Sequence, residues 1–135
     1  MAGRAKVGVF VVTDEVMIMS AAVKPLITLA DLDKLDIRCG TIRAVSDVAG
    51  SDKLVQLSVD FGDFQRTILC GIKQERADPA ALTGLQALFV VNLAPKKMCG
   101  VMSEGMMFDI GYADGLLPAA LAQPEFAVPN GVRAG

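Results

Sequence analysis

Near its middle the chain reads Leu54-Val55-Gln56-Leu57-Ser58-Val59-Asp60-Phe61. Apolar and polar residues alternate along this stretch, which is the pattern of a β-strand that buries one of its faces. A Gly-Asp pair at residues 62–63 then gives a turn signal, and residues 64–70 form a second β-prone run. The stretch therefore predicts an antiparallel hairpin at the centre of a β-domain.

Three more strands are expected around this hairpin. Residues 37–48 form a long β-prone run that contains Gly40, and residues 86–93 and 105–110 form two shorter runs. A glycine inside a strand often marks a bulge or a bend, and such a bend lets one strand serve both sides of a small barrel. We therefore expect residues 37–48 to be shared in this way.

A short helix is expected between the third and fourth of these strands. Asp78 is a suitable N-cap, Pro79 suits the first helical position, and Gly84 suits the end of the helix. Five strands with a helix in this place is the order of an OB-fold barrel, although other small α+β folds share it. The predicted class is all-β, a five-stranded OB-fold barrel with N- and C-terminal extensions.

The predicted barrel domain covers residues 25–135, and residues 1–24 form an N-terminal extension. Within the extension, the apolar runs 7–12 and 16–19 are separated by a turn-like Thr-Asp-Glu at residues 13–15. These runs are compatible with a hairpin, with an interface strand, or with a start placed too early, in which case Met17 or Met19 is the initiator. Thr28 and Asp31 then predict one or two capped helical turns.

Composition limits the kind of partner that the chain can have. The 135 residues are 53% apolar and carry a net charge of −2, with a pI of about 5.0. An acidic domain cannot coat nucleic acid through bulk charge, so RNA binding would require a local basic patch. The apolar surplus in residues 7–23 and 116–128 exceeds what a small barrel can bury, which predicts a homodimer joined through these chain ends.

The residue inventory argues against an enzyme, a metal site and a membrane span. The sequence has no histidine, no glycine-rich phosphate-binding motif and no plausible carboxylate pair, so we expect no catalysis and no cofactor. Cys39, Cys70 and Cys99 are dispersed, which suits packed thiols in a reducing cytoplasm better than zinc ligands. No apolar stretch approaches the roughly 20 residues that span a bilayer, and a cytoplasmic location is expected.

The segment 92–106, in which residues 94–100 are expected to form a loop, has the residue types that bind a single-stranded RNA end. Lys96 and Lys97 suit phosphates, Ser103 and Glu104 suit base edges, and Met106 suits packing against an unstacked base. The alternative interpretation is a polar turn whose lysines keep an apolar hairpin in solution. The residues alone leave both interpretations open.

Five blocks occur together in a specific order. They are Leu35-Asp36-Ile37-Arg38-Cys39-Gly40-Thr41-Ile42, Ser51-Asp52-Lys53-Leu54, residues 92–100, Ser103-Glu104-Gly105-Met106 and Val128-Pro129-Asn130-Gly131. In this order they resemble the tRNA-binding domain family. That family includes free-standing dimeric bacterial tRNA-binding proteins and the C-terminal domain of many methionyl-tRNA synthetases, and CsaA-type export chaperones form a sister branch. The resemblance implies recognition of tRNA by shape and backbone, and it is compatible with docking on an aminoacyl-tRNA synthetase.

The resemblance also assigns site residues. It implies that Lys53 and Lys97 are the family's lysines, and it places Ser103, Glu104 and Met106 in the conserved block around Gly105. The residues themselves add further candidates, Lys96 beside Lys97 and a flanking basic stripe made of Arg38, Arg43, Arg66 and Lys73. Two positions depart from the family pattern: Cys99 replaces a loop arginine, and residues 48–51 replace a His-Pro turn.

A CsaA-like export chaperone is the alternative function. Such a protein would bind unfolded polypeptide in an apolar groove at a dimer interface. Flexible methionines suit a promiscuous groove of this kind, although methionines of a last strand also suit the core. The methionines in question are Met98, Met102, Met106 and Met107.

Overall fold

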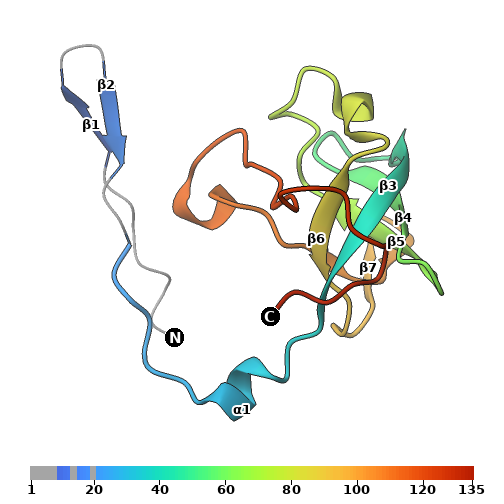
Figure 1. The fold of residues 1–135 in the computed structure, drawn as a ribbon. Coiled ribbons are helices and arrows are strands. Elements are labelled where there is room, and N and C mark those ends of the chain that lie inside the picture. Colours follow the sequence, from blue (N-terminus) through green and yellow to red (C-terminus); the bar gives the residue numbers. More distant parts are fainter. Residues whose placement is uncertain (1–8, 13–14, 19–20) are drawn as a thin grey trace.

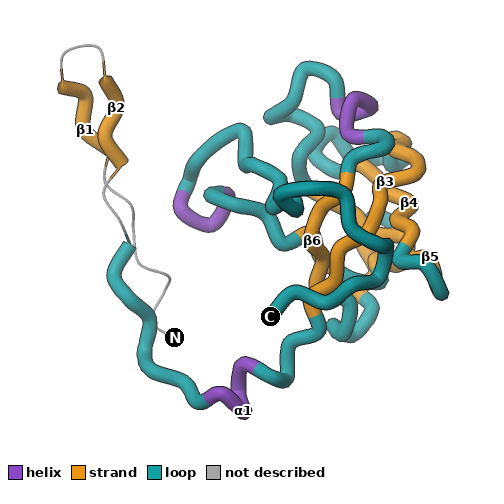
Figure 2. The backbone as a smooth tube through the Cα atoms, in the orientation of Figure 1, coloured by secondary structure: helices purple, strands orange, loops and turns teal. Residues whose placement is uncertain are grey.

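The computed structural model describes residues 9–12, 15–18 and 21–135. Figure 1 shows a β-barrel with a long N-terminal segment that leads away from it, and Figure 2 shows that the barrel carries wide loops. The elements, in chain order, are β1 (Val9–Val12), β2 (Glu15–Ile18), α1 (Leu29–Leu32), β3 (Ile37–Asp47), β4 (Val55–Asp60), β5 (Gln65–Cys70), η1 (Pro79–Leu82), β6 (Gln86–Val90), β7 (Lys96–Met98), β8 (Val101–Ser103), β9 (Met106–Met107) and η2 (Tyr112–Asp114).

Five antiparallel strands build the barrel in the order β5-β4-β3-β6-β9. The long strand β3 pairs with β6 through Ile37–Thr41 and with β4 through Thr41–Asp47, so it serves both sides of the barrel as predicted. The sheet approaches closure where the Glu104 N–H donates to the Thr67 carbonyl of β5 at 2.8 Å. The predicted OB-like barrel and its central β4–β5 hairpin are confirmed.

Gly40 does not form the bulge that the sequence suggested. The irregularity lies between Ile42 and Ala44, so the extra residue of β3 is Arg43. A Cβ atom on Gly40 would lie 2.6 Å from Val59 Cγ1 and 2.8 Å from Phe61 Cε1. Glycine is therefore needed at position 40 because the Val59 and Phe61 side chains approach it closely, and the irregularity in β3 has a separate origin.

The core fills the barrel with the inward-facing residues of its strands. Val55, Leu57 and Val59 are buried while the residues between them are half-buried, which confirms the predicted alternation. The Phe61 ring meets the Phe89 ring edge to face, with 5.6 Å between the ring centroids, a geometry that aromatic pairs favour. Leu82 of η1 is also buried and closes one end of the core.

The helix between the third and fourth strands is present as the 3₁₀-helix η1. Asp78 occupies its N-cap position but makes no capping hydrogen bond through its side chain, and Pro79 is the first helical residue. The Gly84 N–H donates to the Ile42 carbonyl at 2.7 Å, so the chain returns to the sheet directly after one turn. This early return to β3 prevents a longer helix.

Two expectations about the last third of the chain are wrong in detail. Residues 94–100, expected to be a loop, contain β7 and continue into β8, and the two strands form a small hairpin outside the barrel sheet. The last barrel strand, expected over residues 105–110, is reduced to β9. Beyond it the chain bends away, and Ile110 instead bridges to Ala120 in the C-terminal part of the chain.

Both ends of the chain extend beyond the five strands. The predicted capping box is present, since Thr28 Oγ1 accepts from the Asp31 N–H at 3.1 Å and the Asp31 carboxylate accepts from the Thr28 N–H at 3.2 Å. The C-terminal segment follows the start of β3, where the Ala134 N–H donates to the Ile37 carbonyl at 2.8 Å. No helix in the described part of the chain is long and apolar enough to cross a bilayer.

The N-terminal extension forms a hairpin in its described residues. Strands β1 and β2 pair antiparallel, with Val12 opposite Glu15. The pairing is compatible with the expected hairpin, and the interface strand and the early start stay predictions. The predicted turn includes residues 13–14, and the second apolar run ends at residue 19; these positions, like residues 1–8, lie outside the described residues.

Candidate nucleic-acid interface

The β7–β8 hairpin presents two adjacent lysines to solvent. Lys96 lies opposite Ser103, Lys97 opposite Met102 and Met98 opposite Val101. The two-residue turn between the strands is Cys99-Gly100, with φ angles of +48° and +80°. Tight hairpins of this type need positive φ at both central residues, so the turn fixes the register that places both lysines on an exposed strand.

Apart from Arg66, the predicted cationic site residues fall into two electrostatic groups. No ion pair involves Lys53, Lys96 or Lys97 in the part of the chain that the structure describes, and all three are exposed. The other group is paired with carboxylates. It consists of Arg38 with Asp36 at 2.9 Å, Arg43 with Asp60 at 2.9 Å and Lys73 with Asp47 at 3.2 Å.

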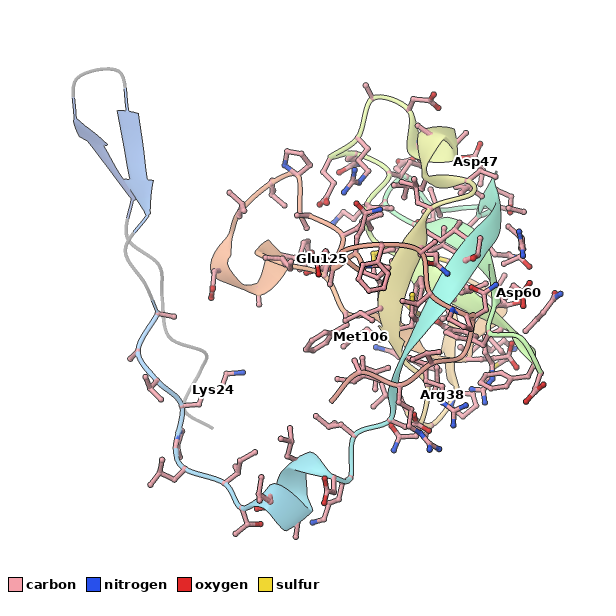
Figure 3. The ribbon with its side chains drawn as sticks, in the orientation of Figure 1. Lys24, Arg38, Asp47, Asp60, Met106 and Glu125 are labelled. Atoms are coloured by element: carbon pink, nitrogen blue, oxygen red, sulfur yellow. The ribbon has the colours of Figure 1, made fainter. Side chains whose placement is uncertain are left out.

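Carboxylates lie between the cations of the basic stripe that the sequence suggested. The Gly62 N–H and the Arg43 guanidinium, in that order, lower the pKa of the Asp60 carboxyl, which therefore stays ionised beside the arginine. Asp47, the partner of Lys73, stands at the opposite end of β3 from Arg38 (Figure 3). Each cation of this group thus lies beside an aspartate carboxylate that offsets its charge.

Ser103 and Glu104 lie at the seam between β8 and β5. Ser103 is only 4% exposed, and its hydroxyl accepts from the Leu69 N–H at 3.0 Å and donates to the Gly105 carbonyl at 3.1 Å. A carboxylate oxygen of Glu104 accepts from the Thr67 N–H at 2.9 Å. The polar groups that we expected to read base edges are therefore engaged in joining the hairpin to the barrel.

Gly105 and Met106 follow this seam and differ in exposure. A Cβ atom on Gly105 would lie 2.8 Å from the Val90 carbonyl oxygen, so the close approach of the β6 end requires glycine there. Met106 is 49% exposed, whereas Met107 is 6% exposed and belongs to the core. Met106 is thus exposed enough to pack against an unstacked base, whereas Met107 packs in the core.

Arg66 points inward at the mouth of the barrel. It shares a face of β5 with Ile68 and Cys70, and its guanidinium carbon lies 4.9 Å from the centroid of the Phe64 ring. Its Nη1 donates to the Val91 and Glu104 carbonyls at 3.0 and 2.9 Å. The alternation along β5 is the sequence signal that would have placed Arg66 on the core side.

A second arginine approaches the same ring from β3. The Arg38 guanidinium carbon lies 5.5 Å from the Phe64 centroid, and the group donates two hydrogen bonds to Asp36 at 2.9 and 3.0 Å. Arg133 adds a third bond to Asp36 at 3.3 Å. Hydrogen bonding to Arg38 is the main cause of the lowered pKa of Asp36. Sequence reasoning missed Phe64, the ring on which both guanidinium groups rest.

Lys53 lies apart from the hairpin, in the turn between β3 and β4. The Ser51 hydroxyl accepts from the Lys53 and Leu54 N–H groups at 3.3 and 3.0 Å and so fixes this turn. Cys99, by contrast, lies at the exposed tip of the hairpin, while Cys39 and Cys70 are buried. Burial raises the pKa of the Cys70 thiol to about 12, so this thiol is protonated at neutral pH.

An apolar groove lies beside α1, on a different part of the surface from the hairpin. Its volume is about 730 Å³. Leu32 and Leu35 contribute from the α1 region, Leu88 from β6 and Phe108 from the segment after β9, and residues 133–135 also line it. Several of these side chains are half-exposed, so the chain presents apolar surface close to its C-terminus.

Comparison with known proteins gives consistent matches. The family described as "Putative tRNA binding domain" matches residues 37–132. The methionine–tRNA ligase of Methanococcoides burtonii is 44% identical over 103 residues, which make up 76% of this chain and 15% of the ligase. The chain therefore spans about 15% of the length of that curated relative.

Two solved structures share the fold over most of the chain. The MetRS-related protein of Pyrococcus horikoshii superimposes with a TM-score of 0.75 at 34% identity, covering 83% of this chain and 100% of that protein. The CsaA chaperone of Bacillus anthracis gives a TM-score of 0.70 at 27% identity, covering 82% of this chain and 100% of that one. The chain is thus similar both to synthetase-related domains and to chaperones of the CsaA type.

Proposed function

The chain belongs to the tRNA-binding domain family, and on that premise we propose that it is a non-catalytic module that binds tRNA through the β7–β8 hairpin. Recognition is of shape and backbone, because exposed lysines contact phosphates and carry no sequence information. A tRNA ligand implies work in the cytoplasm. The similarity to methionine–tRNA ligases makes an aminoacyl-tRNA synthetase a reasonable partner.

The observation that carries this proposal is the unpaired state of the hairpin lysines. On a chain of net charge −2, Lys96 and Lys97 are adjacent and exposed, and neither has an ion pair among the described residues. Counterions released from RNA phosphates by such charges supply a favourable free energy at little desolvation cost. Arg38, Arg43 and Lys73 would first have to give up a carboxylate, so their contribution is smaller.

The remaining site residues take supporting places in this proposal. Met106 offers an exposed, flexible side chain to an unstacked base, and Lys53 adds a phosphate contact from the β3–β4 turn. Ser103 and Glu104 act on the hairpin, since their hydrogen bonds join it to β5. The proposed interface is therefore small, local and cationic, on an acidic body.

A double substitution of the hairpin lysines tests the proposal. Lys96→Ala combined with Lys97→Ala should weaken tRNA binding at least about tenfold, or 1.4 kcal/mol. The slope of log affinity against log salt should become shallower by roughly 1.5 to 2, as two phosphate contacts are lost. Fluorescence anisotropy with labelled tRNA at several salt concentrations measures both quantities.

The matched control is Arg43→Ala with Lys73→Ala, which also removes two positive charges but takes them from existing ion pairs. This variant should bind within about twofold of the parent, because exposed ion pairs leave little net charge for the ligand. If the hairpin variant and the parent gave the same titration at every salt concentration, the hairpin would not be the site.

A CsaA-like chaperone remains the second candidate, and the apolar groove beside α1 favours it. Unfolded polypeptide would be bound through Leu32, Leu35 and Phe108, and the hairpin lysines would contribute little. Phe108→Ser should then abolish protection of a reduced, unfolded client from aggregation, while the hairpin variant keeps it. The tRNA-binding proposal predicts instead that the hairpin variant loses tRNA affinity, whether or not it protects the client.

A further inference from the structure

One nitrogen atom connects the two ends of the segment that carries the lysine hairpin. Arg66 Nη1 donates one hydrogen to the Val91 carbonyl at 3.0 Å and the other to the Glu104 carbonyl at 2.9 Å. Val91 directly follows β6, and Glu104 directly follows β8. Arg66 therefore bridges the points at which the chain leaves the barrel and returns to it.

The Arg66 guanidinium is held before any ligand arrives. It lies over the Phe64 ring at 4.9 Å from the centroid, and Phe64 is itself stacked on the buried Phe61 at 5.2 Å. Hydrogen bonds from a charged donor are about twice as strong as those between neutral groups. Because the planar guanidinium is already oriented, little further entropy is lost when it bonds two carbonyls.

Hydrogen bonds of Ser103 and Glu104 also attach this segment to the barrel. The Glu104 N–H and carboxylate both bond the Thr67 backbone, and Ser103 Oγ bonds the Leu69 N–H. These contacts fasten the returning end of the segment to β5. The Arg66 side chain is hydrogen-bonded to both ends of the segment, to Val91 where the chain leaves the barrel and to Glu104 where it returns.

We propose that Arg66 is a positioning residue for tRNA binding: it fixes the base of the β7–β8 hairpin so that Lys96 and Lys97 are preorganised, and it does not itself contact RNA. The inference rests on the proposed function. A hairpin freed at its base must be ordered again when the ligand binds, and this entropic cost reduces affinity. Arg66 thus acts on tRNA through the two lysines.

Two substitutions separate positioning from direct contact. Arg66→Met keeps an apolar stem against Phe64 and removes the donors, whereas Arg66→Lys keeps the charge but ends one atom short of Nη1. Both should lower tRNA affinity about fivefold, the scale of reordering a short segment, with the salt slope of the parent. In the Lys96→Ala, Lys97→Ala background, Arg66→Met should cause no further loss.

Arg38→Met is the matched control, because Arg38 also lies over Phe64 but donates to Asp36 and not to the hairpin segment. It should bind tRNA within about twofold of the parent, since its charge is already paired. A salt slope reduced by about one in Arg66→Met, together with parental binding by Arg66→Lys, would instead mean a direct phosphate contact. Either that result or an additive loss in the lysine-free background would overturn the proposal.

Hydrogen exchange without tRNA tests the bridge itself. In both Arg66 variants the amides of residues 96–103 should exchange faster than in the parent, while those of β4 keep their protection. Unchanged exchange in the hairpin would overturn the inference; if Arg66→Met does not fold, Arg66→Lys gives the same readout. A parent that failed to bind tRNA would refute the proposed function, and faster exchange would still establish that Arg66 holds the hairpin.

Discussion

At the level of single residues, the exposed thiol at the hairpin tip has the strongest bearing on affinity. Cys99 has a positive φ of 48° and lies two residues after Lys97, within the segment proposed to meet tRNA. The sequence resemblance implies an arginine at this position in the family pattern. Because its side chain is exposed, a longer side chain at this position enters solvent and does not disturb the core.

Cys99→Arg should therefore tighten tRNA binding by about 1 kcal/mol, the scale of one exposed charge-assisted contact. The melting temperature should stay near that of the parent, since both residues have a Cβ and pay the same cost for positive φ. Affinity and melting are measured together on the same preparation. A large fall in melting temperature would show that the side chain at position 99 packs inward.

A second residue-level consequence concerns Asp36, whose pKa is held below its ordinary value chiefly by hydrogen bonds from Arg38. A carboxyl with a lowered folded pKa stabilises the fold fully above its unfolded pKa of about 3.9. That contribution is lost as the pH falls through the lower, folded value. Acid should therefore weaken the link between the start of β3 and Arg133.

Asp36→Asn should lower the free energy of unfolding at pH 7 by roughly 1 kcal/mol, the scale of a partly exposed charge pair. Its stability should also fall less steeply than that of the parent between about pH 5 and pH 2. Thermal melts across this range measure both effects. Asp52→Asn, in the exposed β3–β4 turn, is the control; equal pH profiles for parent and Asp36→Asn would contradict the assignment.

At the level of elements, β3 determines how the barrel is built, because its two halves pair with different strands. Gly40 lies near the end of the half that pairs with β6. Atoms of the Val59 and Phe61 side chains lie within 3 Å of the position that a Cβ on Gly40 would take. The space is taken by fully buried groups with little freedom to move.

Gly40→Ala should thus destabilise the fold by about 1–3 kcal/mol, the usual cost of overpacking a core. Gly71→Ala is a matched control, since nothing lies within 4 Å of its added Cβ and its φ is not in the left-handed region. Urea unfolding of the two variants compares them directly. Equal midpoints would mean that β3 can move away from β4 without cost.

The elements also show which features were predictable from sequence. The alternation at residues 54–61 and the Thr28–Asp31 capping box depend on local spacing, and both are present. The β7–β8 hairpin was missed because its turn residue Cys99 is not one of the usual residues with positive φ. The bridge from Arg66 to two backbone carbonyls leaves no sequence signal, because any residue supplies a carbonyl.

The candidate site was likewise predictable only in part. Lys96 and Lys97 could be identified because adjacent lysines in an acidic chain are conspicuous in the sequence. The roles of Ser103 and Glu104 at the seam with β5 could not, because they depend on contacts more than thirty residues away. Ion pairs such as Arg43 with Asp60 likewise depend on the register of β3 against β4.

At the level of the whole molecule, apolar surface remains uncovered beside α1 and in the C-terminal segment. Leu32 and Phe108 line the groove beside α1, and Leu117 and Phe126 are exposed in the C-terminal segment. Exposed patches of this kind usually mark an interface. We propose that two copies associate through these surfaces, which would give one tRNA two hairpins to contact.

Light scattering at micromolar concentration should therefore give twice the 14.2 kDa mass of the chain. Leu32→Glu should shift the mass toward the monomer, because it places a charge in the apolar groove. Leu85→Glu, at an exposed leucine outside the groove, is the control and should remain dimeric. A monomeric parent would refute the association.

The base of the hairpin segment has a consequence for how such a protein can diversify. Arg66 donates to the backbone carbonyls of Val91 and Glu104, so these bonds require no particular side chain between the two residues. Since the entropy of closing a loop grows only with the logarithm of its length, each doubling of the insert costs just about 0.6 kcal/mol. Residues 93–102 are thus a suitable position for a graft, where evolution or a protein engineer can exchange one binding segment for another while the barrel beneath keeps its fold.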